Sequence, residues 1–225
     1  GPSVKAIKDP GRIAEHDWIG VNGSPALFGK ELPPMRIYHV NDSTYLSSSL
    51  DAFLRFAACA EFTVIDFRGM YELLRLVPGN LPSTQFVVYD SWAYPLRLPL
   101  GKIQSLVDAC CHKGVYLSPD LSLGLPTGGT VAYTAGQISW HAGYGSLYIY
   151  GLDLTNTGRF YQEHSQQPQM LDKAFDQVIQ PSFELLARES RRTGFRIFNC
   201  NPESRLPAAV IPRLNAEESF NNLNI

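Results

Sequence analysis

The chain has 225 residues and a hydrophobic fraction of 44%, enough for a globular protein with a sizeable buried core. Its net charge of -2 excludes a strong overall field that would draw it to nucleic acid or to an acidic membrane. The sequence contains no apolar run of roughly 18 residues, so we expect no bilayer-spanning helix.

The cysteines and the N-terminus both bear on the compartment. The four cysteines are Cys59, Cys110, Cys111 and Cys200. None has CxxC spacing, so we expect free thiols in a reducing environment. The N-terminus lacks the charged-then-apolar pattern of a secretion signal. These features favour a cytoplasmic protein.

The first half of the chain alternates apolar strand patterns with helical spacing. In chain order it predicts strands over 18–22 and 36–40, a helix over 48–60, a strand over 62–67, a helix over 70–76 and a strand over 86–89.

The second half begins with a proline-containing segment, 92–100, which we interpret as a loop that could act as a lid. It then predicts a helix over 103–112 closed by Gly114, a helix over 130–141, a strand over 146–150, a helix over 170–192 broken or kinked at Pro181, and a strand over 195–200. Alternating strands and helices imply parallel strands with crossover helices, and therefore a layered α/β sheet.

Polar residues follow several of these strands. Asn22, Gly23 and Ser24 end the first strand, Asn41 and Asp42 end the second, and Gly151 and Asp153 follow the strand over 146–150. Ligands of open α/β sheets bind outside the carboxyl ends of the strands. The same residue types also cap helices and start loops, but several at one sheet edge favour a pocket.

Further polar residues could contact a phosphate. Gly129 and Thr130 precede a helix and could present N–H groups to an anion. Arg159 could neutralise a phosphate, and Tyr161 could donate its hydroxyl to one. His164 could act as a general base. A helix cap, a surface arginine, a packed aromatic ring and an exposed histidine are the competing interpretations.

Several familiar motifs are absent. The chain has no GxxxxGK[ST], no GxGxxG and no HExxH, which argues against a P-loop, a dinucleotide site and a zinc site. A DxD pair in strand-end context and a GxSxG are also missing. We therefore expect no metal and no cofactor, and these absences argue against a hydrolase.

The order of several segments is similar to that in bacterial sialyltransferase-like enzymes: GPSVKAI at 1–7, DWIGVNGS at 17–24, GYGSLYIYGLDL at 143–154 and RFY at 159–161. With DLSLG at 120–124 and GLDLTNTGRFYQE at 151–163, nearly the whole sequence resembles the lipopolysaccharide core Kdo-III transferase family, the WaaZ (RfaZ) type.

This resemblance implies a single Rossmann-like α/β domain over residues 1–225, with the family's first strand falling before Gly1. The donor would be CMP-Kdo, a CMP-activated 3-deoxy-2-ulosonic acid, and the acceptor an inner-core sugar of lipopolysaccharide. Transfer would need no metal. Peripheral contact with the cytoplasmic face of the inner membrane would follow from such an acceptor.

The resemblance also implies roles for individual residues. Asn22 and Asn41 would contact the nucleotide, and Tyr161 would lie near the phosphate of the leaving CMP. The full predicted nucleotide site is Ser3, Asn22, Gly23, Ser24, Asn41, Gly129, Thr130, Gly151, Arg159 and Tyr161.

The catalytic base and the donor stay open. The second tyrosine of the sialyltransferases is replaced by Thr155, and their catalytic histidine lies in an insertion that this chain lacks. Asp42, Asp153, Glu163 and His164 are therefore rival candidates for the base, with a structural role as the alternative for the carboxylates. The other readings are a CMP-sialic acid-dependent transferase, a non-catalytic lipopolysaccharide-assembly protein on the same scaffold, and a pyrophosphokinase-like enzyme.

Overall fold

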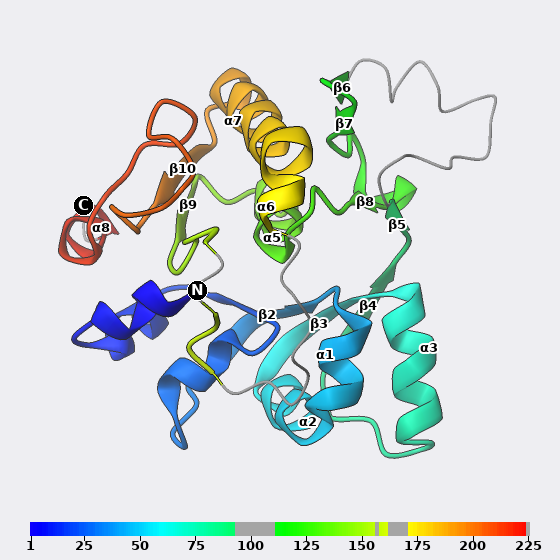
Figure 1. The fold of residues 1–225 in the computed structure, drawn as a ribbon. Helices are drawn as coiled ribbons and strands as arrows, with labels where there is room; N and C mark the ends of the chain where they lie inside the picture. Colours follow the sequence, from blue (N-terminus) through cyan, green and yellow to red (C-terminus); the bar gives the residue numbers. More distant parts are fainter. Residues whose placement is uncertain (93–110, 156–157, 162–170, 224–225) are drawn as a thin grey trace. The chain divides into compact units, whose positions relative to one another are not determined.

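The computed structural model of the chain describes residues 1–92, 111–155, 158–161 and 171–223 (Figure 1). The chain forms two compact units. The sheet unit comprises Lys5–Asp90 and Arg159–Pro168, and the mixed unit comprises Gly1–Val4, Ser91–Gly158 and Gln169–Ile225. No helix among the described residues is both long enough and apolar enough to cross a membrane.

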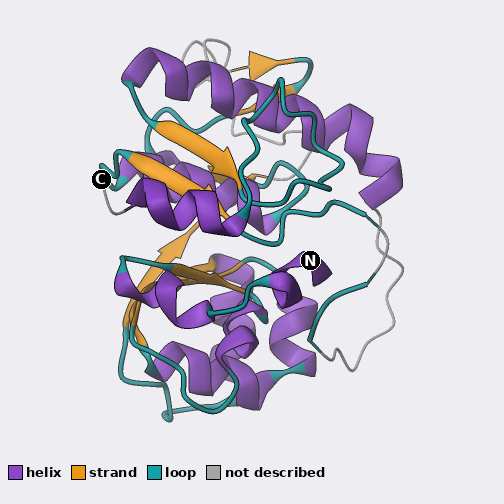
Figure 2. Cartoon of the chain, turned by 90° about the vertical axis from the view of Figure 1, so that its left-hand side faces the viewer, coloured by secondary structure: helices purple, strands orange, loops and turns teal. Residues whose placement is uncertain are grey.

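The sheet unit is built on a parallel four-stranded sheet with the order β1-β2-β3-β4. Its strands are β1 (Ile19–Val21), β2 (Met35–Val40), β3 (Ala60–Asp66) and β4 (Gln85–Tyr89). Helices flank this sheet, as the purple and orange elements of Figure 2 show. The predicted α/β class with a mostly parallel, Rossmann-like sheet is thereby confirmed. The extent of a single domain over the whole chain stays a prediction.

Short helices precede and connect these strands. They are the 3₁₀ helices η1 (Pro2–Ala6), η2 (Pro10–Glu15) and η3 (Ser24–Phe28), and the α-helices α1 (Ser43–Ser48), α2 (Leu50–Ala58) and α3 (Phe67–Leu76). The first of them, η1, begins in the mixed unit and ends in the sheet unit. The helix predicted over 48–60 is therefore α2, preceded by the separate helix α1. Ser49, at φ -141°, interrupts the two because that backbone conformation cannot continue a helix.

The core of the sheet unit lies between β2 and the helices. Tyr38 is fully buried, with its ring centroid 5.6 Å from that of Phe53 and 5.9 Å from that of Phe56. Leu46 and Ile65 are likewise fully buried in this cluster. Aromatic side chains bury large apolar areas, so this cluster is a main source of the unit's stability.

The mixed unit contains small sheets and longer helices. Its strands are β5 (Ser91–Trp92), β6 (Cys111–His112), β7 (Val115–Tyr116), β8 (Leu125–Pro126), β9 (Ser146–Ile149) and β10 (Arg196–Asn199). Its helices are η4 (Leu121–Leu123), α5 (Val131–His141), α6 (Leu171–Ala174), η5 (Phe175–Ile179), α7 (Gln180–Thr193) and α8 (Ala216–Leu223). Strands β9 and β10 pair in parallel, as do β5 and β8.

The end of the helix predicted over 103–112 is wrong. Cys111 and His112 form β6, which pairs antiparallel with β7. Between them Lys113 has φ 49° and Gly114 has φ 78°, and two successive positive φ values make the tight turn that suits a hairpin. Gly114 is therefore a turn glycine and not the predicted helix stop. Residues 93–110, including most of the predicted loop and helix, lie outside the described residues.

The long helix predicted over 170–192 is present and irregular before Pro181. The segment η5 is π-helical, and the Gln180 N–H donates to the Phe175 carbonyl five residues back. Proline lacks an N–H and its ring crowds the preceding turn, so a wider turn just before Pro181 relieves both constraints. The helical conformation continues from η5 into α7, so Pro181 does not break the helix as predicted, and α7 begins with this proline in its first turn.

The hairpin β6–β7 is attached to α7 through Glu184. The Glu184 carboxylate accepts hydrogen bonds from Lys113 Nζ at 2.8 Å, from Gln180 Nε2 at 2.9 Å and contacts His112 Nε2 at 3.0 Å. The hydrogen bonds from Lys113 and then Gln180 lower the pKa of Glu184 from 4.5 to about 2.

A pKa that is depressed in the folded state stabilises the fold above the unfolded pKa, and this stabilisation is lost as the pH falls through about 2. We expect Glu184→Gln to lower the free energy of unfolding by about 0.5–1 kcal/mol near neutral pH, because the pair is partly solvated. The difference from wild type should shrink as the pH falls below about 4, in urea unfolding curves. The exposed Glu203→Gln is the control. Equal destabilisation by both variants would contradict this role of Glu184.

Candidate functional site

The structure places the predicted site residues in two groups. Within the sheet unit lie Asn22, Gly23, Ser24, Asn41, Asp42, Arg159 and Tyr161. Within the mixed unit lie Ser3, Gly129, Thr130, Gly151 and Asp153. Glu163 and His164 lie outside the described residues.

Asn22 has its backbone fully engaged and its side chain available. It follows β1, and its N–H donates to the His39 carbonyl at 3.0 Å while its carbonyl accepts from the Tyr38 hydroxyl at 3.0 Å. Its backbone is left-handed, with φ 46°, a conformation that asparagine tolerates. Its Oδ1 is buried and has no hydrogen-bond partner among the described residues. A buried acceptor without a donor is costly, so this atom is suited to a ligand's N–H or O–H.

Gly23 is required by the ring of Tyr161. A Cβ atom at Gly23 would lie 2.4 Å from Cε2 of Tyr161, far inside van der Waals contact. The ring therefore lies directly against the backbone that follows β1. The edge of the Tyr45 ring also meets this ring, with the centroids 6.3 Å apart.

Arg159 connects Tyr161 to the end of β2. Its Nη1 donates to the Tyr161 hydroxyl at 2.6 Å, and its Nη2 lies 3.9 Å from Asp42 Oδ2. Both charged side chains are about one-third exposed. A guanidinium beside a phenol strengthens the phenol as a hydrogen-bond donor, so the pair is suited to an anionic ligand.

Asp42 is first of all the N-cap of α1. Its Oδ1 accepts from the backbone N–H groups of Thr44 at 3.0 Å and Tyr45 at 3.2 Å. Asn41 directly precedes it and is half-buried. Asp42 thus has one oxygen engaged in the cap and the other turned toward Arg159. Both Asn41 and Asp42 lie at the carboxyl end of β2, as the strand pattern predicted.

Three other predicted residues have local structural roles. Ser24 Oγ accepts from the Val21 N–H at 2.8 Å and closes the turn after β1. Thr130 Oγ1 accepts from the Ala132 N–H at 3.3 Å as the N-cap of α5. Gly129 has φ 74°, and a Cβ there would lie 3.0 Å from Ile179 Cγ1. Thr130 is therefore the helix cap, and Gly129 is required by its positive φ and its contact with Ile179.

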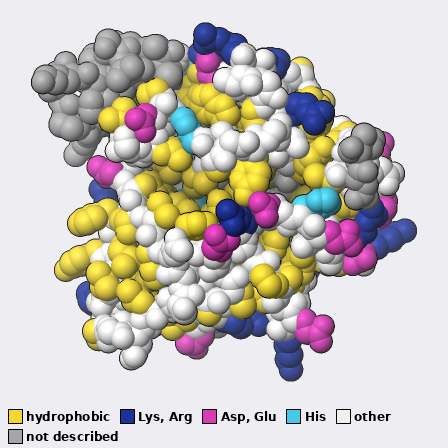
Figure 3. Space-filling view, turned by 180° about the vertical axis from the view of Figure 1, so that it is seen from behind, with side chains coloured by type: hydrophobic (Ala, Val, Ile, Leu, Met, Phe, Trp, Pro, Cys, Tyr) yellow, Lys and Arg dark blue, Asp and Glu magenta, His cyan; other side chains and the backbone are white. Residues whose placement is uncertain are grey.

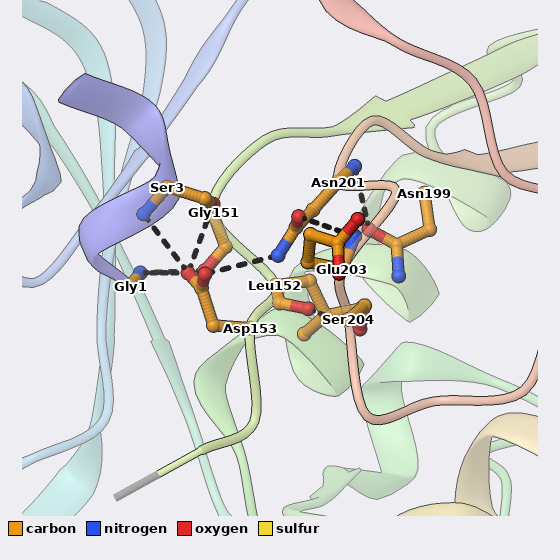
Figure 4. Close-up of polar contacts among 9 residues, drawn as sticks. All are labelled: Gly1, Ser3, Gly151, Leu152, Asp153, Asn199, Asn201, Glu203 and Ser204. Atoms are coloured by element: carbon orange, nitrogen blue, oxygen red, sulfur yellow. Dashed lines mark hydrogen bonds and ion pairs between the residues drawn. The ribbon is translucent and has the colours of Figure 1, made fainter. Parts of the chain in front are cut away.

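In the mixed unit, Asp153 joins three segments of the chain through hydrogen bonds (Figure 4). Its Oδ2 accepts from Ser3 Oγ at 3.0 Å, and its Oδ1 accepts from Asn201 Nδ2 at 2.9 Å. The neighbouring Gly151 carbonyl accepts from the Gly1 nitrogen at 2.5 Å, and the Leu152 carbonyl accepts from Ser204 Oγ at 2.5 Å. The buried carboxylate of Asp153 thus joins η1 to the loops after β9 and β10. This geometry favours the structural role over the catalytic one.

Sequence reasoning missed the two tyrosines that position the β1 loop. The Tyr38 hydroxyl contacts both the Asn22 carbonyl and, at 3.4 Å, the Tyr45 hydroxyl. Burial, followed by the proximity of Tyr45, raises the pKa of Tyr38 well above its usual value, so it stays a neutral donor. In the sequence Tyr38 is one residue of an apolar strand, and nothing in the strand pattern indicates which groups its hydroxyl contacts. Asn201 directly follows the strand predicted over 195–200, so the sequence indicates its place at a strand end, but not its hydrogen bond to Asp153.

Metal ligands do not gather in the described part of the chain. Among those residues, no group of three or more His, Cys, Asp or Glu side chains could hold a metal ion. The metal-independent chemistry expected from the sequence stays a prediction.

Two curated protein sequences are similar to this chain over most of its length. One, from Salmonella typhimurium, is named a probable 3-deoxy-manno-octulosonic acid transferase and is 26% identical over 219 residues, covering 90% of this chain and 80% of that protein. The other, from Escherichia coli, has the same name and is 26% identical over 230 residues, covering 90% of this chain and 78% of that protein.

Neither a protein-family model nor a solved structure matches the chain significantly. The two relatives carry the Kdo transferase name that the sequence resemblance implied. The Kdo-III type and the relation to the sialyltransferases stay predictions.

We expect Asp153→Asn to lower the free energy of unfolding by about 1–3 kcal/mol, because it replaces one acceptor oxygen by an amide donor in a buried network. Urea unfolding measures this loss. The matched control is Asp176→Asn, an exposed aspartate of the same unit. If the two variants unfold at the same urea concentration, the hydrogen bonds of Asp153 do not stabilise the fold.

Proposed function

We propose that the protein transfers Kdo from CMP-Kdo to an inner-core sugar of lipopolysaccharide. The observation that carries this proposal is the constellation of Asn22, Gly23, Asp42, Arg159 and Tyr161 at the carboxyl ends of β1 and β2. Similarity over 90% of the chain to two proteins named probable 3-deoxy-manno-octulosonic acid transferase supports the sugar.

The constellation suits a nucleoside monophosphate. The buried Asn22 Oδ1 can accept from a donor such as the cytosine amino group or a ribose hydroxyl. Arg159 supplies a fork of N–H donors for phosphate oxygens, and the Tyr161 hydroxyl lies 2.6 Å from it. Because Gly23 has no side chain, the Tyr161 ring can stay close to the β1 loop that holds Asn22.

The proposed reaction breaks the bond between the anomeric carbon of Kdo and the phosphate oxygen of CMP. The bond electrons stay with the phosphate, and the acceptor hydroxyl forms the new bond to the anomeric carbon while it loses its proton. Arg159 and the Tyr161 hydroxyl stabilise the negative charge that develops on the leaving CMP. In other transferases a divalent cation stabilises this charge. Because Arg159 and Tyr161 stabilise it in the proposed reaction, that reaction needs no metal.

The proton of the acceptor hydroxyl goes to a base that we assign among Asp42, Glu163 and His164. Asp42 is partly exposed, and its Oδ1 is engaged in the cap of α1, so Oδ2, which lies 3.9 Å from Arg159 Nη2, is the oxygen that would take the proton. Asp153 is the weakest of the original candidates, because both of its oxygens accept hydrogen bonds from the protein. An acceptor of this kind would bring the protein to the cytoplasmic face of the inner membrane.

The nucleotide part of the proposal is tested by CMP binding. We expect CMP to raise the melting temperature of the wild-type protein, since a ligand of the native state stabilises it. Arg159→Ala should weaken CMP binding by at least about tenfold in calorimetry, because it removes the phosphate fork. Arg191→Ala, an exposed arginine of α7, is the control. A CMP affinity that is unchanged in Arg159→Ala would exclude the assigned site.

The chemical role of Tyr161 is tested separately. Tyr161→Phe keeps the ring against Gly23 and removes only the hydroxyl, so we expect CMP affinity within about threefold of wild type and a kcat at least about tenfold lower. Mass spectrometry with a truncated core acceptor and either CMP-Kdo or CMP-sialic acid measures transfer and identifies the donor. Transfer of sialic acid alone would support the alternative donor. CMP binding without transfer of either sugar would support a non-catalytic assembly protein.

A further inference from the structure

An exposed apolar patch covers one edge of the sheet unit. We define the β4–α3 patch as Phe67, Tyr71, Leu74, Leu81, Val87 and Val88. Phe67 and Tyr71 are each 66% exposed, and Val87 and Val88 are each 44% exposed. Figure 3 shows hydrophobic side chains, in yellow, gathered at its lower left, on the side where α3 and β4 lie.

The α3 part of the patch is a stripe along the helix. Phe67, Tyr71 and Leu74 follow the spacing i, i+4, i+7 and therefore lie on one face. The opposite face of α3 is buried, because Gly69 and Leu73 pack against the core of the sheet unit. The helix thus has two apolar faces, and only one of them is covered within the described chain.

The β4 part of the patch is an uncovered strand edge. Among the described strands, β4 pairs with β3 only, so its other edge presents backbone N–H and C=O groups without a strand partner. Adjacent residues of a strand point to opposite faces, so the exposure of both Val87 and Val88 leaves both faces open there. The sequence Gln85–Tyr89 contains neither charge nor proline, the usual protections of an edge strand.

The other edge of the same sheet is different. Strand β1 has three residues, and its burial pattern shows no exposed side chain. Short edge strands do not template further pairing. The contrast indicates that β4, and not the sheet in general, is adapted to pairing.

We propose that the β4–α3 patch is the interface between two copies of this chain, formed by antiparallel pairing of β4 with β4 and packing of α3 against α3. A two-fold axis perpendicular to the sheet brings the same strand and the same helix of both copies together, as a self-complementary interface requires. An uncharged strand pairs with itself without repulsion.

The size of the patch fits this partner. Side chains of Phe and Tyr have about 150–250 Å² each, so the six exposed side chains leave on the order of 500 Å² of apolar surface. A standard interface buries about 800 Å² per partner, a little over half of it apolar.

A second copy fits the patch better than a lipid bilayer. Hydrocarbon offers no hydrogen-bond partners for the free edge of β4, whereas another strand satisfies it. The charged residues of α3 are Arg68, Glu72 and Arg75, and Glu72 is hydrogen-bonded to Arg75 at 2.6 and 3.0 Å. Arg68 is the other charged residue of α3, and a single arginine does not form the basic cluster that binds anionic lipid surfaces.

The test is the mass of the full chain in solution. We expect sedimentation equilibrium of the wild-type protein to give twice the chain mass of 25.0 kDa. Val87→Lys and Tyr71→Lys, tested singly, should each weaken the dimer by at least about tenfold, because each buries a charge in the interface. Ala58→Lys, at an exposed position of α2 in the same unit, is the matched control and should leave the dimer unchanged.

Hydrogen exchange then identifies the strand. In the dimeric wild type, amides of residues 85–89 should exchange more slowly than in Val87→Lys, while those of β1 and β2 stay unchanged. Thermal melts check that both variants fold. A wild-type protein that is monomeric at every soluble concentration would overturn the proposal. So would a dimer that both folded variants retain, or a monomer that floats with anionic phospholipid vesicles and loses this binding in Tyr71→Lys.

Discussion

The hydrogen bond from the buried Tyr38 hydroxyl to the Asn22 carbonyl connects the core of the sheet unit to its candidate site. The Tyr38 ring packs on Phe53 and Phe56, so α2 holds the ring, and the ring's hydroxyl holds the turn after β1. With its backbone fixed in this way, Asn22 keeps a left-handed conformation and directs a buried amide oxygen that no described residue satisfies. Packing and ligand chemistry are therefore linked through a single side chain, since a change in the aromatic core would move the turn.

The same principle operates around Tyr161. Its ring occupies the space that a side chain at residue 23 would need, and its hydroxyl accepts from Arg159. Arg159 in turn lies near Asp42, which caps α1. Each residue thus has a structural partner as well as a possible ligand. Polar groups that are positioned before a ligand arrives need little reorganisation, which is the condition for stabilising charge on a leaving group.

The mixed unit uses its polar residues differently. Asp153, Asn201 and Ser3 satisfy one another, so hydrogen bonds connect the ends of β9 and β10 in addition to the apolar packing of Leu152 and Leu206. Arg213 adds to this by donating to the carbonyl groups of Pro202, Ser204 and Leu206. A strand-end aspartate is therefore not by itself a catalytic residue, even where its position matches a ligand-binding edge.

The sequence by itself determined the α/β class, because apolar runs of strand length alternate with helical spacing and this pattern permits few other architectures. It also placed Asn22, Asn41 and Asp42 at strand ends, since strand boundaries follow from local composition. It failed at residues 111–114, where a two-residue turn looks locally like a helix stop. Only the tertiary structure decided that Tyr161 packs on Gly23, that Asp153 is held by Ser3 and Asn201, and that β4 pairs with β3 alone among the described strands. Those outcomes depend on contacts between residues far apart in the chain, and local pattern carries no information about such contacts.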